Sequence, residues 1–322
     1  MVLGSSRAIV KLRSLRIGYE IEDEILWVVD SIDLDIPYNT IYCLVGESGC
    51  GKTTIGSAIA GLLPPYAVLE GYLEIDGKKV VDGIHTNYEG IRGKVVTRIP
   101  QDPATSLNPF LTIGEQLEDV LRIHFGIKGS KARERAIKLL NLVKLPIDVL
   151  DRYPHELSGG MKQRAAIALA LAPQPKIIVA DEPTSNLDAY LKGLIASLLR
   201  SLRNVLKLTI VLITHDIAIA STICDYIAVV YAGKVVEHGP KDLVVKNPLH
   251  PYTKLLLKVV PSLGSKERLT PIPGTPPEPG KYPSGCRFRL RCPWYLNECI
   301  TEPILTEVEP NHFVACWRYA MK

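Results

Sequence analysis

The chain has no run of about 18 or more consecutive apolar residues, which is the length needed for a membrane-spanning helix. Its amino-terminal stretch, MVLGSSRAIVKLRSL, also lacks the apolar region of a secretory signal peptide. We therefore expect a cytoplasmic protein with no transmembrane segment of its own. A membrane protein as its partner is not excluded by this test.

The chain also has little excess charge: 38 Lys and Arg residues against 34 Asp and Glu residues give a formal net charge of +4. Proteins that bind nucleic acid usually concentrate basic residues on one face. The densest basic stretch, KGSKARERAIK at 128–138, includes Glu134 and is typical of a solvated helix face. We therefore predict no nucleic-acid partner.

The length of 322 residues fits one large domain with an appendage better than a single domain of average size. Short runs rich in β-branched residues predict strands between positions 8 and 100, and helical periodicity follows from about 113 to 172. Two continuous apolar runs, KIIVAD and KLTIVLITHD, then flank another helical stretch. Continuous apolar strands that alternate with helices predict an α/β fold whose parallel sheet is covered on both faces.

The stretch GESGCGKTT, 46–54, fits the pattern G-x-x-x-x-G-K-[ST] and lies between the apolar run IYCLV and a helical stretch. In this setting the backbone N–H groups of the loop point at phosphate oxygens, at the positive end of the helix. Lys52 would reach the β and γ phosphates of a nucleotide, and Thr53 would offer its hydroxyl to Mg²⁺. The alternative is a glycine-rich turn with an incidental lysine.

Further polar positions come at the ends of predicted strands. The run IIVADEP ends with Asp181 and Glu182, and ligands of open α/β sheets bind beyond the carboxyl ends of the strands. We assign Asp181 to Mg²⁺ and Glu182 to the water that attacks the γ phosphate. His215, in VLITHD, and Gln101, in RIPQDP, are weaker candidates, for the γ phosphate and for a bound water. The alternatives are charges that cap a strand, a structural histidine and a glutamine that solvates a turn.

In ELSGGMKQRAAIALALA, Ser158, Gly159 and Gly160 precede a clean helical stretch. An exposed helix N-terminus has unpaired donors and a positive dipole, so it can bind an anion. Because the chain has only one phosphate loop, we predict that this second site serves a nucleotide of another subunit. The alternative is a serine-capped helix with a glycine turn.

These motifs occur in the order and approximate spacing of ABC-type ATPase subunits, which the chain resembles over nearly its whole length. QDPATSLNP, YAGKVVEHGP, NPLHPYTKLLLKVVPSL and PIPGTPPEP are similar to the oligopeptide/dipeptide importer subfamily. The resemblance implies a P-loop (RecA-like) ABC ATPase core with an antiparallel β subdomain, an inserted helical subdomain and a small C-terminal four-cysteine module. The implied boundaries are 1–250 for the nucleotide-binding domain, about 102–172 for its helical subdomain, 251–322 for the C-terminal domain, 270–285 for a Pro/Gly-rich linker and 286–316 for the cysteine module.

The resemblance also implies roles for individual residues. The implied ATP-binding residues are Tyr19, which would stack on adenine, with Gly46, Glu47, Ser48, Gly49, Cys50, Gly51, Lys52, Thr53, Thr54 and Gln101. The implied Mg²⁺ ligands are Thr53, Gln101 and Asp181. The implied catalytic residues are Glu182 as general base, His215 as γ-phosphate sensor, and Lys52. The implied signature residues, which would act on ATP bound to the partner subunit, are Ser158, Gly159, Gly160 and Gln163. The implied D-loop consists of Ser185, Asn186, Leu187 and Asp188.

The implied function is ATP-driven dimerisation that powers uptake of oligopeptides or dipeptides, at the cytoplasmic face of the cell membrane. The implied partners are a second, related ATPase subunit in a heterodimer, two transmembrane permease subunits and, through them, an external solute-binding protein. Oligosaccharide and nickel importers use similar subunits, so these cargoes remain alternatives. A soluble ABC ATPase that acts on DNA or ribosomes is disfavoured, because the chain has one cassette and no sustained heptads.

The chain has only seven cysteines, and four of them lie near its end. Their spacing, C-x5-C-x6-C and then sixteen residues, differs from zinc ribbons and from the bacterial ferredoxin run. The cytoplasm disfavours a disulfide framework, so we predict a shared inorganic centre. The resemblance implies a [4Fe-4S] cluster held by Cys286, Cys292, Cys299 and Cys316, with structural zinc or empty thiols as the alternatives. We expect Cys43, Cys50 and Cys224, which lie inside the ATPase body, to be small buried or loop residues.

Overall fold

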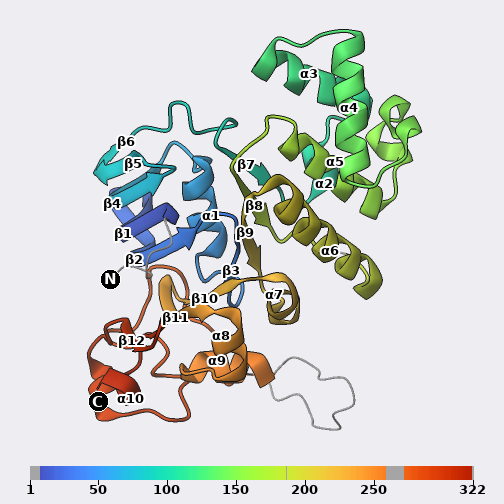
Figure 1. Cartoon of the computed structure of the whole chain (residues 1–322). Helices are drawn as coiled ribbons and strands as arrows, with labels where there is room; N and C mark the ends of the chain where they lie inside the picture. Colours follow the sequence, from blue (N-terminus) through green and yellow to red (C-terminus); the bar gives the residue numbers. More distant parts are fainter. Residues whose placement is uncertain (1–7, 186, 259–271, 321–322) are drawn as a thin grey trace. The chain divides into compact units, whose positions relative to one another are not determined.

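The computed structural model describes residues 8–185, 187–258 and 272–320 (Figure 1). These residues form two compact units, one from the ranges 1–87 and 213–322 and the other from the range 88–212. The chain passes from the second unit back to the first within strand β9 (Thr209–Thr214). In the described part of the chain, no helix is long and apolar enough to span a membrane.

The first unit contains an antiparallel sheet with the strand order β2-β1-β4-β5-β6. The strands are β1 (Ala8–Ile21), β2 (Glu24–Pro37), β4 (Ala67–Ile75), β5 (Lys78–Gly83) and β6 (His85–Thr86). Asp76 and Gly77 both have positive φ, 51° and 80°, as a two-residue hairpin turn between β4 and β5 requires. The sheet confirms the predicted antiparallel β subdomain.

The first unit also contains strands of a second sheet, in the order β12-β13-β11-β10-β3. They are β3 (Ile41–Val45), β10 (Tyr226–Tyr231), β11 (Lys234–Pro240), β12 (Thr306–Glu309) and β13 (His312–Val314). Strand β10 runs parallel to β3, and the other pairs are antiparallel. The C-terminal strands therefore extend a sheet whose strand β3 ends at the predicted phosphate loop.

The helices of this unit include α1 (Lys52–Ala60), α7 (Ile217–Ile223), α8 (Lys241–Lys246), α9 (Pro251–Lys258) and α10 (Trp317–Ala320), with a 3₁₀ turn, η3 (Asn297–Ile300). Gly61, with φ of 68°, ends α1 in a left-handed cap. Asp216 begins α7 by accepting hydrogen bonds from the N–H groups of Ala218 and Ile219.

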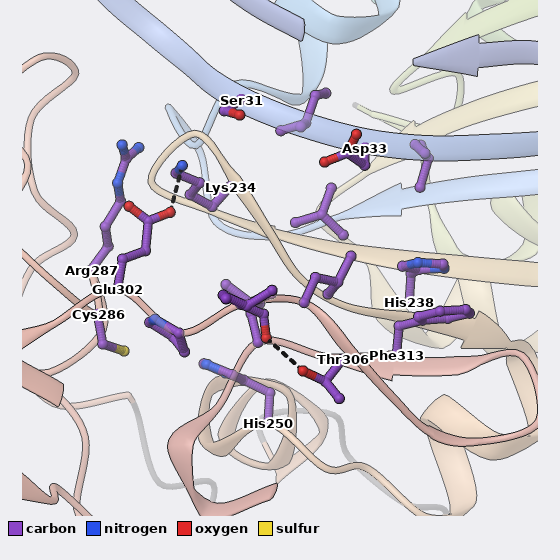
Figure 2. Close-up of a pocket in the computed structure, with 18 of the residues that line it drawn as sticks. Ser31, Asp33, Lys234, His238, His250, Cys286, Arg287, Glu302, Thr306 and Phe313 are labelled. Carbon is purple, nitrogen blue, oxygen red and sulfur yellow. Dashed lines mark hydrogen bonds and ion pairs between the residues drawn. The ribbon is translucent and has the colours of Figure 1, made fainter. Parts of the chain in front are cut away.

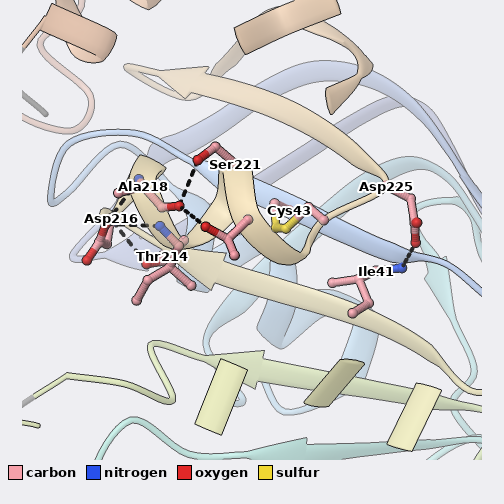
Figure 3. Close-up of a disulfide and its surroundings, with 10 residues drawn as sticks. Ile41, Cys43, Thr214, Asp216, Ala218, Ser221 and Asp225 are labelled. Carbon is pink, nitrogen blue, oxygen red and sulfur yellow. Dashed lines mark hydrogen bonds between the residues drawn. A yellow bond between two sulfur atoms is a disulfide. The ribbon is translucent and has the colours of Figure 1, made fainter. Parts of the chain in front are cut away.

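Cys43 and Cys224 are joined by a disulfide, with their Cα atoms 6.0 Å apart (Figure 3). Cys43 lies on β3 and Cys224 follows α7, and both are buried. The burial expected at these two positions is confirmed, but the sequence did not predict that they pair. Their separation of 181 residues hides the pairing from the sequence.

The second unit contains parallel strands β7 (Val96–Ile99) and β8 (Ile177–Asp181). Its helices and turns are α2 (Pro103–Ser106), α3 (Ile113–Phe125), α4 (Ser130–Leu142), η1 (Ile147–Asp151), η2 (Pro154–Glu156), α5 (Gly159–Leu171) and α6 (Ala189–Leu206). Thr112 and Glu115 form a capping box that begins α3, the clearest of the helices predicted from periodicity. With the phosphate loop between β3 and α1, the two units give the predicted P-loop α/β fold.

Candidate nucleotide-binding site

Residues 46–54 form the loop that joins β3 to α1. Gly46, Gly49 and Gly51 have φ angles of 156°, 79° and 103°, which side-chain-bearing residues rarely adopt. A Cβ atom on Gly46 would also lie 2.2 Å from the carbonyl oxygen of Val230. The local backbone therefore requires the glycines that define the sequence motif.

The loop has an exposed side and a buried side. Ser48, Gly49 and Thr53 are exposed, whereas Cys50 and Lys52 are buried. The N-terminus of α1 follows directly, so the positive end of the helix dipole favours an anion at the exposed side. This geometry suits the phosphates of a nucleotide.

Lys52 lies within the loop, with only 4% of its surface exposed. Its Nζ donates to the backbone carbonyl oxygens of Gly46 and Glu47, each at 2.8 Å. The ammonium group is thus held at the loop by the loop's own backbone. Burial raises the pKa of the neighbouring Cys50 thiol. The backbone of Cys50 is also held, because its carbonyl oxygen accepts a hydrogen bond from Gly233 N at 3.0 Å.

Tyr19, the residue expected to stack on adenine, lies beside the end of the loop. Its hydroxyl donates to Thr54 Oγ1 at 3.4 Å, and its ring centroid is 6.0 Å from that of Tyr66. Tyr66 is 55% exposed and was not singled out by any sequence motif. The two tyrosines provide an aromatic surface next to the phosphate loop.

His215 is exposed and follows the end of β9 in the first unit. The turn around it is fixed, because Asp216 N donates to Thr214 Oγ1 at 3.0 Å and Asp216 in turn caps α7 (Figure 3). The histidine is therefore presented at the carboxyl end of a buried strand, as the sequence predicts.

Three predicted site residues come together in the second unit. Gln101 Nε2 donates to Glu182 Oε2 at 3.4 Å, and Ser185 Oγ donates to the Gln101 carbonyl oxygen at 3.3 Å. Glu182 has a left-handed φ of 43°, and its carbonyl oxygen accepts a hydrogen bond from Ser185 N at 3.0 Å. A residue other than glycine in this conformation is uncommon and recurs at functional sites.

Asp181 is buried at the end of β8, where Arg98 NH2 contacts its carboxylate at 2.5 Å. Arg98 lies on the adjacent strand β7. No motif pointed to Arg98, because the contact joins residues 83 positions apart. The predicted metal carboxylate is therefore also half of an ion pair.

The predicted signature residues begin α5. Ser158 caps this helix by accepting from Met161 N at 3.4 Å, and both Ser158 and Gly159 are exposed. Gln163 is buried, and its Nε2 has no hydrogen-bond partner in the described part of the chain. A Cβ atom on Gly160 would lie 3.3 Å from Leu191, on helix α6, so the glycine allows the two helices to approach closely.

Of the predicted D-loop, Asp188 caps α6 by accepting from Leu191 N at 2.9 Å. Leu187 is partly buried beside it. Asn186 lies outside the described residues. The D-loop therefore directly precedes a helix that packs close to the start of α5.

The four C-terminal cysteines are all free thiols in the first unit. Burial raises the pKa of Cys286 to about 12, and the nearby thiols of Cys299, Cys316 and Cys292 raise it further. The thiols are thus near enough to interact. Within residues 8–185, 187–258 and 272–320, however, no set of three or more His, Cys, Asp or Glu side chains is placed to hold a metal ion. The number and chemistry of these donors fit a metal centre, but their positions do not form a ligand set.

A separate cavity of about 560 Å³ lies in the first unit (Figure 2). It is lined by residues of β1, β2 and β11, by His250 and by residues between positions 285 and 315, and by none of residues 46–54. Lys234 contacts Glu302 at 2.6 Å and Arg13 contacts Asp35 at 2.7 Å, so its charges largely pair with one another. Nothing in this lining indicates a charged ligand.

Known proteins are similar to this chain in sequence and in fold. The family described as "ABC transporter" matches residues 29–185, and "Oligopeptide/dipeptide transporter, C-terminal region" matches residues 236–299. The oligopeptide transport ATP-binding protein OppD of Haemophilus influenzae is 36% identical over 317 residues, covering 98% of each chain. The oligopeptide transport ATP-binding protein AppD of Bacillus subtilis is 38% identical, covering 97% of each chain.

A solved dimeric ATP-binding cassette, in a post-hydrolysis state with ADP and Pi, has a TM-score of 0.64 and 32% sequence identity. The match covers 72% of this chain and 98% of that one. The chain therefore belongs to the ABC transporter family, as an ATP-binding and ATP-hydrolysing subunit of an oligopeptide importer.

Proposed function

We propose that residues 46–54 hold the phosphates of ATP and that Glu182 is the general base of its hydrolysis. The observation that supports this assignment best is the loop between β3 and α1, where three glycines with positive φ precede a helix N-terminus. Lys52 is kept at the loop by two backbone carbonyl groups, from which it can turn to the β and γ phosphates. Tyr19 lies at the end of the loop, where an adenine ring could stack.

The hydrogen bonds around Glu182 support its role as a base. Gln101 contacts its carboxylate and Ser185 N fixes its backbone, so the side chain is held at the end of β8. A carboxylate in this place can accept a proton from the attacking water, with His215 as the sensor of the γ phosphate. The proton would move from that water to Glu182 Oε1 or Oε2 as the oxygen attacks phosphorus.

The proposed ligands of Mg²⁺ are Thr53, Gln101 and Asp181. A hydroxyl, an amide oxygen and a carboxylate are the oxygen donors that Mg²⁺ prefers. The ion, when bound, would neutralise developing charge on the phosphates. Because Arg98 contacts the Asp181 carboxylate, Arg98 and the metal would share or compete for it.

The exposed start of α5 supports a nucleotide sandwich between two subunits. Ser158 and Gly159 are open to a partner, and the helix N-terminus favours an anion. We place the ATP bound by a related but distinct ATPase subunit there. Gly160, Gln163 and the D-loop would belong to the same contact with that subunit. ATP would bind the closed pair better than the open pair, because both subunits contact it only when closed.

In the assembled importer, the pair of ATPase subunits would act on two transmembrane permease subunits at the cytoplasmic face of the membrane, and an external protein would deliver the solute. In this chain, the nucleotide-binding domain would span 1–250, with the helical subdomain at about 102–172, and the C-terminal domain would span 251–322. The first two residues of the linker proposed at 270–285 lie outside the described residues. Peptides are the proposed cargo, and the solute that stimulates ATP hydrolysis by the reconstituted importer would identify it.

We also propose that the C-terminal thiols bind a [4Fe-4S] cluster, with zinc as the alternative. Support comes from the presence of four free cysteines in this part of the chain, and burial together with neighbouring thiols raises the pKa values of Cys286, Cys292 and Cys316. Anaerobic purification followed by iron, sulfide and zinc analysis tests the proposal. Four iron and four sulfide per chain are expected for the cluster, one zinc without iron would establish the alternative, and the absence of all three would reject both.

Glu182→Gln tests the assignment of the base. Loss of a general base reduces turnover by about 10²- to 10⁴-fold, whereas the amide keeps the shape of the site. We expect ATP affinity within about twofold of the parent chain's and hydrolysis reduced by at least about a hundredfold. Glu134→Gln, on the exposed face of α4, is the matched control and should hydrolyse ATP normally. A Glu182→Gln chain with normal turnover would remove the base assignment.

A further inference from the structure

Glu47, the second residue of the phosphate loop, is held through its side chain, its N–H and its carbonyl group. Its carboxylate accepts two hydrogen bonds from Arg291, at 2.7 Å from NH1 and 3.0 Å from NH2. Its N–H donates to Tyr252 Oη at 2.8 Å, and its carbonyl oxygen accepts from Lys52 at 2.8 Å. The first two contacts come from residues more than 200 positions later in the chain.

Arg291 is buried, with 6% of its side chain exposed. Besides Glu47, its guanidinium donates to the Pro273 carbonyl oxygen at 2.7 Å and to Tyr231 Oη at 3.3 Å. Burial opposes the charge, but the hydrogen bonds with Glu47 and Tyr231 outweigh it, so the pKa of Arg291 is raised. The Glu47 side chain is partly buried, and its bidentate pair with this guanidinium has a specific geometry.

Aromatic rings fill the space around this contact. The ring centroids of Tyr231 and Tyr252 are 4.7 Å apart, and the Phe288 centroid lies 5.1 Å and 5.4 Å from them. All three side chains are fully buried. Phe288 and Arg291 both belong to the stretch GCRFRLRC, 285–292, which includes the first two cysteines of the C-terminal group. We call residues 285–292 the Arg–Cys segment.

A second arginine of the Arg–Cys segment reaches the loop indirectly. Arg287 donates to the Ala232 carbonyl oxygen and to the Asp30 carboxylate. Ala232 and Gly233 form the turn between β10 and β11, and Gly233 N donates to the Cys50 carbonyl oxygen at 3.0 Å. The segment therefore contacts the phosphate loop directly near its start and, through this turn, near its middle.

We propose that Arg291 is a positioning residue for the phosphate loop, through which the Arg–Cys segment regulates the affinity for ATP. The proposal rests on the proposed function, because it takes residues 46–54 as the ATP site. Arg291 fixes Glu47 and so selects the loop conformation that receives the phosphates. When only a fraction of the chains has a competent loop, the apparent dissociation constant rises in inverse proportion to that fraction.

The test measures ATP binding by the full chain and ATP hydrolysis by the assembled importer. For Arg291→Gln we expect the dissociation constant and KM for ATP to rise about tenfold, with kcat at saturating ATP within about twofold of the parent value. Arg291→Lys, which keeps the charge but not the bidentate contact, should recover part of the affinity. Amide exchange in residues 46–54 of the nucleotide-free chain should be faster in Arg291→Gln.

Glu47→Gln approaches the same contact from the loop and does not depend on folding of the C-terminal segment. We expect Glu47→Gln to lose about tenfold in ATP affinity, as Arg291→Gln does. The Glu47→Gln/Arg291→Gln double variant should also lose about tenfold rather than a hundredfold, because the two changes remove the same interaction. Arg289→Gln is the matched control: it removes the same charge from the same segment, and the bond of its side chain is to Ser284. It should bind ATP normally.

Three results would overturn the proposal. They are normal or tighter ATP binding by Arg291→Gln, a loss confined to kcat, and additive losses in the double variant. Lys52→Ala separates this failure from failure of the proposed site. If Lys52→Ala loses ATP and Arg291→Gln does not, only the coupling is wrong, whereas normal binding by Lys52→Ala would show that residues 46–54 are not the ATP site.

Discussion

Glu237, on β11, is a completely buried carboxylate whose removal should loosen one defined part of the first unit. It accepts hydrogen bonds from Leu249 N at 2.9 Å, from His250 N at 2.8 Å and from His312 Nε2 at 2.8 Å. These contacts join β11 to the turn before α9 and to β13. Replacing Glu237 by glutamine should therefore weaken the junction between all three.

The size of the effect follows from the oxygens involved. Oε1 serves Leu249 and His312, and Oε2 serves His250. In its better orientation the glutamine oxygen replaces Oε1, and its NH₂ group then faces the buried His250 N–H. A hydrogen bond to a charged group contributes about 1.5–3 kcal/mol, and a buried donor without a partner adds a similar penalty, so we expect a loss of about 3 kcal/mol.

Amide exchange followed by mass spectrometry measures this locally, which matters because a chain of two units need not unfold in one step. A loss of about 3 kcal/mol should speed exchange at Leu249 and His250 about a hundredfold. Glu309→Gln is the control, because the Glu309 carboxylate is partly exposed and accepts a hydrogen bond from the Asn247 side chain rather than from a buried backbone N–H group. Exchange within about threefold of the parent rate in Glu237→Gln would refute the reasoning.

Three shorter predictions concern the same unit. Burial lowers the pKa of His250 to about 4 and that of His238 to about 3, so below about pH 6.5 the unfolded chain binds protons that the folded chain does not. Stability should fall as pH drops from 6.5 towards 4, by up to about 1.4 kcal/mol per pH unit per histidine. The urea concentration at the midpoint of unfolding should show this fall, and should fall less steeply in His250→Asn. A midpoint that does not change with pH would contradict the prediction. The buried Tyr42 hydroxyl has no hydrogen-bond partner in the described part of the chain, so Tyr42→Phe should stabilise by about 1 kcal/mol, and a lower Tm would contradict this. Gly46→Ala should abolish ATP binding, because the new Cβ would lie 2.2 Å from the carbonyl oxygen of Val230, and an unchanged dissociation constant would contradict that reading of the loop.

The sequence predicted the parts of the site that depend on neighbours in the chain. The phosphate loop needs glycines at fixed intervals between a strand and a helix, and a pattern of that kind is visible in one sequence. The same is true of the capping residues Ser158 and Asp188 and of the helical periodicity over 113–125. In each case the local chemistry that forms the structure is also the signal that predicts it.

Contacts between distant positions left no such signal. Arg98 meets Asp181 across 83 residues, Cys43 meets Cys224 across 181, and Arg291 meets Glu47 across 244. An arginine next to a cysteine looks the same in the sequence whether it faces solvent or a buried carboxylate. The pairing of β13 with β11 was hidden for the same reason, since three residues of strand contain no periodicity to detect.

Two of the routes by which the C-terminal part of the chain reaches the phosphate loop differ in stiffness. In the first, β13 pairs with β11, β11 with β10 and β10 with β3, which ends at the loop. A strand ladder cannot shift without breaking backbone hydrogen bonds, so this route fixes the base of the loop. In the second, the Arg291 side chain reaches Glu47, and a change of rotamer can open that contact while the sheet stays intact.

Of these two routes, only the second can therefore adjust nucleotide affinity while the sheet stays intact. We therefore expect Arg291→Gln to change ATP binding while leaving exchange at Leu249 and His250 unchanged. Glu237→Gln should speed that exchange and weaken ATP binding less than Arg291→Gln does, because its side chain is linked to the loop indirectly, through Tyr252, two residues after His250. If Glu237→Gln weakened ATP binding as much as Arg291→Gln does, the coupling would pass through the stability of the unit, because Glu237 makes no direct contact with the loop in the described structure. The two variants measured side by side thus separate positioning of the phosphate loop from general support of the fold.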